Sequence, residues 1–346
     1  MDQPEKRSVL RTIAWVFWNP QERRLRLLLR LAGFAFVFMI FSLVMGLVQI
    51  MLMTLFGSGA TPEELLSPAG ANGFELLGPL LMVVATLGSM IISAWALDRR
   101  RFRDYGFGFN RRWWRDFGYG LFLGAAIMLV IFVLEWSLGW IKVTPAWQSE
   151  VYSQGLWLQL LQGLLLFLCV GIYEEALSRG YLLRNIAEGL NAKWWRPGAA
   201  VLLSVLVTSS IFGFAHASNP NATILSSVLI SVAGLMLAAG YVLSGELAIP
   251  IGIHITWNFF QGYVFGFPVS GMVPSGSIFE ITQGGPVLWT GGAFGPEAGM
   301  LGLLAMLVLI LAIWLYTRMQ QPGVDRFQQL VSPTLHRVSG KKGKDS

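Results

Sequence analysis

Residues 155–180 read GLWLQLLQGLLLFLCVGIYEEALSRG, and this stretch decides the fold class. Its first part, up to Tyr173, is uncharged and nearly as long as the roughly 20 residues that a helix needs to cross a bilayer. Glu174, Glu175 and Arg179 follow while the same helix is still at membrane depth. Charged side chains are expensive there, so we interpret these three residues as functional.

The composition points to a membrane protein throughout. The chain has 346 residues, of which 54% are hydrophobic and 13% charged, whereas a soluble domain carries about a quarter charged residues. The apolar runs predict an all-α polytopic membrane protein with about eight transmembrane helices, and the charged residues at membrane depth are expected to line an intramembrane cavity between them. The predicted spans are 32–56, 74–97, 117–140, 157–185, 197–215, 222–243, 247–265 and 298–317.

Lysine and arginine gather in four segments, 1–31, 98–115, 179–196 and 318–346. With eight spans, all four segments come out on the same side of the membrane. The positive-inside rule therefore predicts that both termini are cytoplasmic, in a plasma (inner) membrane. We expect the basic segments to contact anionic lipids, which accounts for the net charge of +6 without nucleic acid as a partner.

The chain divides into three parts. We expect a basic cytoplasmic segment at 1–31, a transmembrane domain at 32–319 and a basic tail at 320–346. The first apolar run is too long for a cleaved signal peptide, so we expect it to be retained as a helix. The segment RRRFRDYGFGFNRRWWRD at 99–116 is typical of an interfacial anchor, and 262–296 is expected to form a long outer loop.

The two adjacent glutamates are predicted to differ in role. Glu175 and Arg179 are four residues apart and share a helical face, so Arg179 can neutralise Glu175. Glu174 lies about 100° around the helix and is left free of this pair. A free carboxylate in a membrane cavity can serve as a general base.

Two further motifs place polar residues inside apolar spans. FGFAH ends at His216, and HITWN begins at His254 and ends at Asn258. These are two of only three histidines; the third, His336, lies in the polar tail and looks incidental. One histidine or asparagine alone is most simply an interhelical hydrogen bond. Together with Glu174, however, three separate spans carry the polar residues of hydrolytic chemistry.

Counting residues along each predicted span places these side chains at different depths in the membrane. Glu174 and His254 lie about 12–17 Å from the basic side at 1.5 Å per residue, whereas His216 falls near the far side. A shared site then requires span 197–215 to tilt or the loop 216–221 to dip inward. We expect the loop to dip, because irregular backbone is allowed where it lines a cavity.

The three motifs resemble those of the CPBP family, named for CAAX proteases and bacteriocin-processing enzymes. EEALSRG resembles its EExxxR motif, FGFAH its FxxxH motif and HITWN its HxxxN motif, in the family's order. The resemblance implies a protease core at about 100–265. It implies an intramembrane endopeptidase acting on a lipidated or hydrophobic peptide or protein. Eukaryotic relatives remove the last three residues of prenylated CAAX proteins, and bacterial relatives are implicated in peptide processing or bacteriocin immunity.

The resemblance also implies residue roles. Glu174 and His216 would activate water, and Glu175 and Arg179 would support the first carboxylate. His254 and Asn258 would stabilise the oxyanion of the tetrahedral intermediate.

Two questions stay open on the sequence. Family members are often described as metalloproteases, and Glu174, His216 and His254 are the ligands that zinc would use. No HExxH motif is present, so we favour a glutamate-dependent mechanism without a metal or other cofactor. The alternative functions are a proton-coupled transporter and a non-catalytic immunity or membrane scaffold protein.

Overall fold

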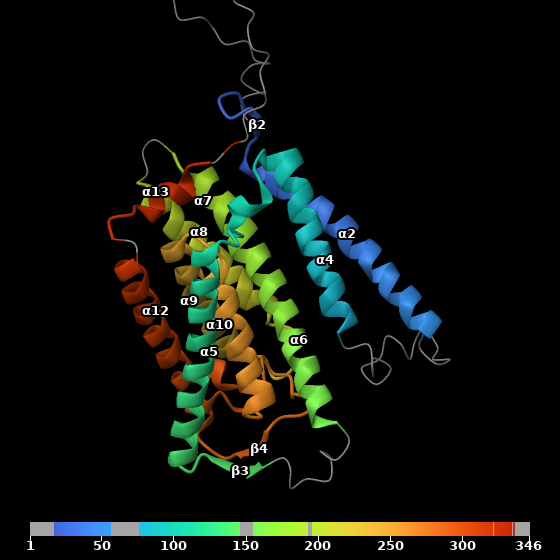
Figure 1. Cartoon of the computed structure of the whole chain (residues 1–346), viewed down its shortest axis with the longest axis vertical. Coiled ribbons are helices and arrows are strands. Elements are labelled where there is room, and N and C mark those ends of the chain that lie inside the picture. Colours follow the sequence, from blue (N-terminus) through green and yellow to red (C-terminus); the bar gives the residue numbers. More distant parts are fainter. Residues whose placement is uncertain are drawn as a thin grey trace, which may run out of the picture.

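The computed structural model describes residues 17–56, 76–145, 155–192, 196–320, 322–333 and 335 (Figure 1). Residues 1–16 of the predicted basic segment 1–31 lie outside the described residues, as do 321, 334 and 336–346 of the tail 320–346, His336 among them. Residues 57–73 and 146–154, which lie between predicted spans, are outside them as well.

Seven helices in the described part are long and apolar enough to cross a membrane, so the chain is an all-α polytopic membrane protein. The remaining predicted span, 247–265, forms a shorter helix, α10, continued by the wide turn η6. The helices are α2 (Leu27–Phe56), α4 (Leu77–Ser93) with η1 (Ala94–Asp98), α5 (Arg111–Ser137), α6 (Leu156–Glu175) with η5 (Ala176–Leu183) and α7 (Arg184–Leu190), α8 (Pro197–Ala215), α9 (Ile224–Ser244), α10 (Ala248–Phe259) with η6 (Phe260–Val264), and α12 (Met300–Gln320).

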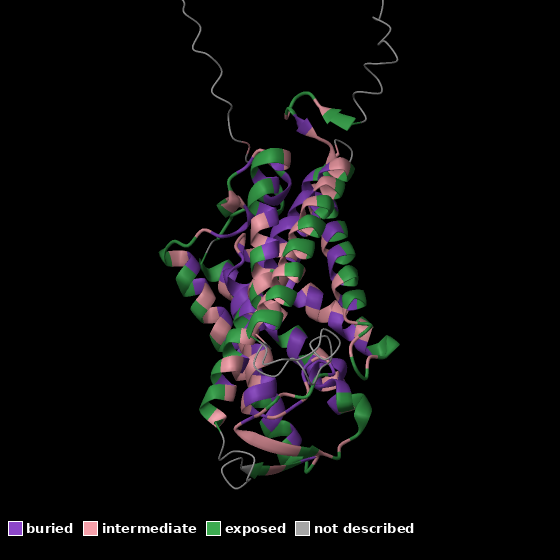
Figure 2. Cartoon of the chain, turned by 90° about the vertical axis from the view of Figure 1, so that its right-hand side faces the viewer, coloured by how far each residue is buried: buried purple, intermediate pink, exposed green. Residues whose placement is uncertain are grey.

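Helix α10 occupies the centre of the bundle, packed against α5, α6 and α9 (Figure 1). All its residues from Ala248 to Ile255 are buried. Glycines allow the close contact with α5, because a Cβ at Gly120 would collide with the Ile249 carbonyl and one at Gly124 with Thr256. Small residues at such contacts let helix backbones approach closely in a membrane. Figure 2 shows the buried residues inside the bundle and the exposed ones on its outer faces.

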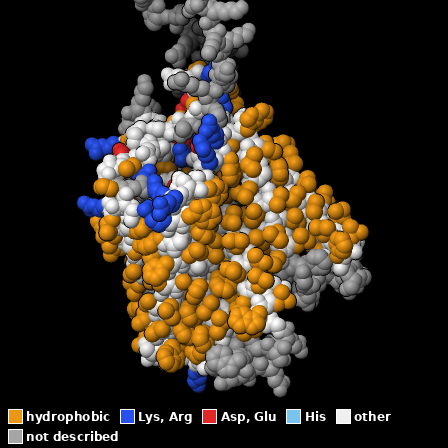
Figure 3. All heavy atoms as spheres, viewed as in Figure 1, with side chains coloured by type: hydrophobic (Ala, Val, Ile, Leu, Met, Phe, Trp, Pro, Cys, Tyr) orange, Lys and Arg blue, Asp and Glu red, His pale blue; other side chains and the backbone are white. Residues whose placement is uncertain are grey.

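Both described ends of the chain lie at the same end of the bundle (Figure 1). The hairpin β1 (Trp18–Asn19) and β2 (Arg24–Leu25) precedes α2, and α13 (Arg326–Val331) follows α12. Lysine and arginine side chains gather at this end in Figure 3, above a surface covered with apolar side chains. We call it the basic end.

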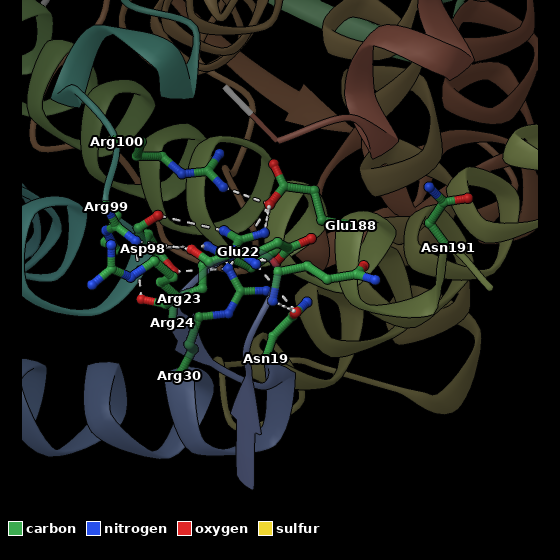
Figure 4. Close-up of polar contacts among 12 residues, drawn as sticks. Asn19, Glu22, Arg23, Arg24, Arg30, Asp98, Arg99, Arg100, Glu188 and Asn191 are labelled. Atoms are coloured by element: carbon green, nitrogen blue, oxygen red, sulfur yellow. Dashed lines mark hydrogen bonds and ion pairs between the residues drawn. The ribbon is translucent and has the colours of Figure 1, made fainter. Parts of the chain in front are cut away.

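A buried ionic cluster at the basic end ties the first helix to the rest of the bundle (Figure 4). Arg30 of α2 donates to Asp98 at the end of η1 over 2.9 Å, and Arg24 pairs with Glu188 of α7 at 3.1 Å. Arg100 also pairs with Glu188 and is only 3% exposed. The segment 99–116 is therefore more than the interfacial anchor that its composition suggested, because Arg100 neutralises a carboxylate inside the protein. The turn η2 (Phe102–Tyr105) continues this segment, and Tyr105 donates to Asp98.

The opposite end is closed by irregular chain. Strand β3 (Ile141–Pro145) pairs antiparallel with β4 (Phe279–Gln283), with Ile141 opposite Gln283. Short helices complete the segment between η6 and α12: α11 (Val287–Thr290), η7 (Gly292–Phe294) and η8 (Pro296–Ala298). Residues 265–299 are here called the cavity loop. They correspond to the predicted outer loop 262–296, except that residues 262–264 belong to the helical turn η6.

Candidate active site

A cavity of about 570 Å³ lies between α6, the end of α8, α9 and α10, and the cavity loop closes it from the end opposite the basic end. Its wall is mostly apolar, with Leu166, Phe167, Val170, Ile230 and Leu237 among its residues. The polar residues that line it are Tyr173, Glu174, His216, Asn219, His254, Asn258, Tyr263, Ser270, Ser275 and Glu297. Four of the six residues selected from the sequence therefore share one cavity, and the other two, Glu175 and Arg179, lie behind its wall.

Glu175 and Arg179 form the buried ion pair that their spacing predicts. Arg179 Nη1 donates to Glu175 Oε1 over 2.9 Å, and both side chains are almost fully buried. Arg179 Nη2 donates to the Gly234 carbonyl of α9 over 3.1 Å. Its guanidinium also lies 4.5 Å from the centre of the Phe212 ring. A carboxylate, a carbonyl and an aromatic ring thus all contact this cation.

His254 stands between the two glutamates. Its Nδ1 is 2.8 Å from Glu175 Oε1, and its Nε2 is 3.8 Å from Glu174 Oε2. The carboxylate of Glu175 accepts, so Nδ1 carries the proton, and Nε2 is the nitrogen left for chemistry. This contact joins residues 79 positions apart. No local spacing rule predicts it.

Glu174 faces the cavity without a strong partner. Its side chain is 19% exposed, and Oε1 accepts a 3.3 Å hydrogen bond from the Tyr173 hydroxyl. Among the described residues Oε2 has no hydrogen-bond partner, since His254 Nε2 is too far for one. The sequence-based expectation that Glu174 stays outside the ion pair is confirmed.

His216 is held by its own helix at the end of α8. Its Nδ1 lies 2.8 Å from the Phe212 carbonyl, which can only accept, so Nδ1 donates and Nε2 is left as the acceptor of a neutral ring. The Phe212 ring lies between the two histidines, 4.8 Å from the centre of His216 and 6.2 Å from that of His254. Phe212 thus packs both histidines and Arg179 against one ring.

The structure explains how His216 reaches the same cavity as Glu174 and His254. Helix α8 has 19 residues, whereas α5 has 27, so α8 is about 12 Å shorter at 1.5 Å per residue. The turn that follows α8 packs on the cavity loop, where Asn219 Nδ2 donates to the Ser270 carbonyl over 3.0 Å. His216 therefore lies within the thickness of the bundle, as the predicted inward dip of 216–221 requires.

Asn258 lies one helical turn after His254 on α10 and lines the same cavity. An asparagine amide there is a neutral hydrogen-bond donor directed at the same space as Glu174 and His254.

Glu297 of the cavity loop was missed in the sequence. It is 4% exposed and lines the cavity, where it accepts from the Gln261 amide and from the Ser270 backbone N–H. Burial raises its pKa to about 7, although these hydrogen bonds oppose the shift. The only signal in the sequence is one acidic residue within the Gly-rich run GGAFGPEAG, which is too weak to select it.

The zinc alternative does not fit the arrangement. No group of three His, Cys, Asp or Glu side chains in the described ranges is placed to hold a metal ion, and this includes Glu174, His216 and His254. We therefore route no chemical step through a metal.

Comparison with known families gives one match. Residues 156–260 match the family Type II CAAX prenyl endopeptidase Rce1-like. This Rce1-like segment runs from α6 to η6 and contains all six residues selected from the sequence. The match confirms the resemblance to the CPBP family that the three motifs suggested. Comparisons with curated proteins and with solved structures give no match.

Proposed function

We propose that this chain is an intramembrane endopeptidase that hydrolyses a peptide bond in a lipidated or hydrophobic substrate, by CAAX-type cleavage or by peptide processing. One observation carries the proposal: Glu174, His216, His254 and Asn258 come from three helices and line a single apolar-walled cavity. The Rce1-like match supports the same reaction class. The apolar wall suits a hydrophobic peptide, and a membrane location gives it access from the bilayer.

Glu174 is the proposed general base. Its carboxylate, which lines the cavity and takes no part in the Glu175–Arg179 pair, accepts a proton from a water molecule there, and the resulting hydroxide attacks the peptide carbonyl carbon. The free Nε2 of His216 accepts the second hydrogen of that water and so fixes its orientation. Both groups are held by contacts that do not involve the water, so they are ready before the substrate arrives.

Asn258 and His254 are proposed to stabilise the oxyanion that forms at the carbonyl oxygen. The Asn258 amide donates without a change of charge. His254 can donate from Nε2 only as an imidazolium, because its other proton is already given to Glu175. When the intermediate collapses, the C–N bond breaks and the leaving amine takes the proton that Glu174 accepted.

Glu175 and Arg179 are positioning residues in this scheme. Glu175 orients the His254 ring through Nδ1, and Arg179 is the buried counter-charge of Glu175. The carboxylate–histidine contact fixes which ring nitrogen faces Glu174.

The test is peptide hydrolysis by the purified protein in detergent and in liposomes. A farnesylated peptide and a non-lipidated apolar peptide would be incubated with the protein, and products identified by mass spectrometry. Glu174→Gln keeps shape but cannot take the proton, so turnover falls on the order of 10²-fold or more. Glu135→Gln is the matched control, because this buried glutamate of α5 bonds Gln283 and lies outside the cavity lining. Wild-type inactivity on both peptides, or an equal loss in both variants, contradicts the proposal and favours the transporter or the immunity and scaffold functions.

The orientation is proposed with the basic end in the cytoplasm, in a plasma (inner) membrane. The support is the gathering of arginine side chains at that end, next to an apolar surface (Figure 3). Exposed arginines there, such as Arg111 and Arg318, are suited to the phosphates of anionic lipids.

A further inference from the structure

The part of the cavity loop that lines the cavity begins with a tight hairpin. The N–H groups of Val269 and Met272 donate to each other's carbonyl oxygens, over 2.8 and 2.9 Å. Ser270 and Gly271, the two residues between them, have φ values of 49° and 84°. Positive φ at both central residues is what a two-residue hairpin turn of type I′ requires. Met272 is therefore the first residue of the returning strand of this hairpin.

The hairpin is held in place by the rest of the protein. The Ser270 N–H donates to the Glu297 carboxylate, and the Ser270 carbonyl accepts from the Asn219 side chain over 3.0 Å. The Gly271 N–H donates to the Phe294 carbonyl over 2.7 Å. These contacts do not involve a ligand, so the returning strand has a fixed position before a substrate binds.

The outer edge of the returning strand carries backbone groups without a partner. In an extended strand, the N–H and C=O groups of successive residues point to opposite edges. Those of Met272 are used by Val269, so those of Val273 point away from the hairpin. Pro274 favours an extended Val273 and lacks an N–H only on the hairpin side, and Ser275 returns to the outer edge. In the described part of the chain, no group bonds the backbone N–H or C=O of Val273 or Ser275.

This edge belongs to the candidate active site. Val273 and Ser275 line the same cavity as Glu174 and His216. Val273 is 80% exposed, so the rest of the protein does not cover it. A peptide that enters a cavity with an apolar wall leaves water behind, and its backbone N–H and C=O groups then need partners in the protein. An extended peptide presents such groups on one edge at the spacing of a neighbouring strand.

We propose that the outer edge of Val273–Ser275 binds the backbone of the substrate as an added β-strand. The inference rests on the proposed function and adds how the same site holds its substrate. Main-chain recognition of this kind selects an extended peptide. In a helix the backbone groups are already bonded to each other. A helical substrate segment must therefore unwind before Glu174 can act on it.

A scan with N-methylated peptides tests the inference on the wild-type protein. The parent probe is Ala-Leu-Ala-Leu, S-farnesyl cysteine and Val-Ile-Leu, with a second parent in which leucine replaces the modified cysteine. One amide at a time is methylated, except that of the cleaved bond. A methyl group removes the donor and separates the strands only where the N–H faces the loop. We expect kcat/KM to fall about tenfold at every second position on one side of the cleaved bond, and to change little at the positions between.

The outcomes of the scan separate the inference from the proposed function. Equal effects at successive positions, or none, mean that the substrate is not bound as a strand; the inference then fails while the proposed function stands. If wild type cleaves neither parent peptide, the proposed function fails and the inference falls with it.

A pair of proline variants locates the edge. Val273→Pro removes the outward N–H, so kcat/KM for the parent probe should fall about tenfold, and the alternation in the N-methyl scan should weaken. Val287→Pro is the matched control. It lies in the same loop outside the cavity lining, at the first position of α11, where proline is tolerated. Thermal unfolding in detergent checks that both variants fold. A folded Val273→Pro that cleaves like Val287→Pro overturns the inference, and if Val273→Pro does not fold, the scan on wild type decides.

Discussion

Removing the charge of Glu175 should destabilise the protein more than the loss of an exposed ion pair would. Glu175 Oε1 accepts from Arg179 Nη1 over 2.9 Å and from His254 Nδ1 over 2.8 Å. In Glu175→Gln, Arg179 stays buried without a counter-charge, a change that costs about 3–5 kcal/mol. Arg179 keeps its contacts with the Gly234 carbonyl and the Phe212 ring, so we expect the lower end, about 3 kcal/mol.

The measurement is equilibrium unfolding in a mild detergent, with peptide turnover on the same samples. Glu175→Gln and Arg179→Met should each lose stability, whereas the double variant should be more stable than the sum of the two losses predicts, because it leaves no unpaired charge. Arg115→Gln is the control: its pair with Asp116 is 3.2 Å long, but the arginine side chain is 48% exposed, so the change should be within about 1 kcal/mol.

Two results would refute this reasoning. Glu175→Gln as stable as Arg115→Gln would mean that the buried pair contributes nothing specific. Losses in the double variant that simply add would mean that Glu175 and Arg179 act independently, despite the hydrogen bond between them.

The remaining predictions concern the metal, the pH and the topology. Turnover should survive strong chelators, because the cavity side chains do not converge on a metal; loss of turnover that zinc alone restores would make Glu174, His216 and His254 ligands. Burial raises the pKa of Glu297 from 4.5 to about 7, so the folded protein binds a proton at Glu297 more tightly than the unfolded chain does. The contribution of Glu297 to the free energy of unfolding should therefore decline by roughly 3 kcal/mol as pH rises from about 4.5 to 7. Glu297→Gln should remove this decline, and a variant with the same pH profile of stability as the wild type would contradict the assignment to Glu297. In a variant whose single cysteine, Cys169, is replaced by alanine, Lys142→Cys should be labelled from outside the cell and Gln329→Cys only after permeabilisation; the reverse pattern would invert the orientation.

The positions of the helices could be predicted from the sequence because the bilayer imposes a simple rule on them. A spanning helix needs a long apolar run, and span 197–215 coincides with α8. The Glu175–Arg179 pair could be predicted equally well, since it depends only on a spacing of four residues along one helix. The ends of the helices were harder to predict. Helix α5 begins at Arg111, six residues before the predicted span, because the Asn110 side chain caps it by accepting a hydrogen bond from the Trp113 N–H.

Contacts between distant segments could not be predicted in this way. The Glu175–His254 bond and the Arg24–Glu188 pair join segments whose relative position is set by packing, and no periodicity encodes that position. Glu297 escaped notice for the same reason, because its burial depends on how the cavity loop folds under α10. The sequence indicated candidate residues for a hydrolytic site, and only tertiary packing determines which of their atoms meet.

The central position of α10 has a consequence for how the protein is made. A helix that enters a bilayer from the translocation machinery is first surrounded by lipid, which admits few polar groups. Helix α10 is short and carries His254 and Asn258, yet from Ala248 to Ile255 its side chains are buried within the protein. Its natural environment is therefore the neighbouring helices, and its insertion depends on α5, α6 and α9 being present to receive it. The candidate active site is then assembled at the same step that completes the bundle, so partly inserted chains lack the arrangement of residues needed to cleave a peptide.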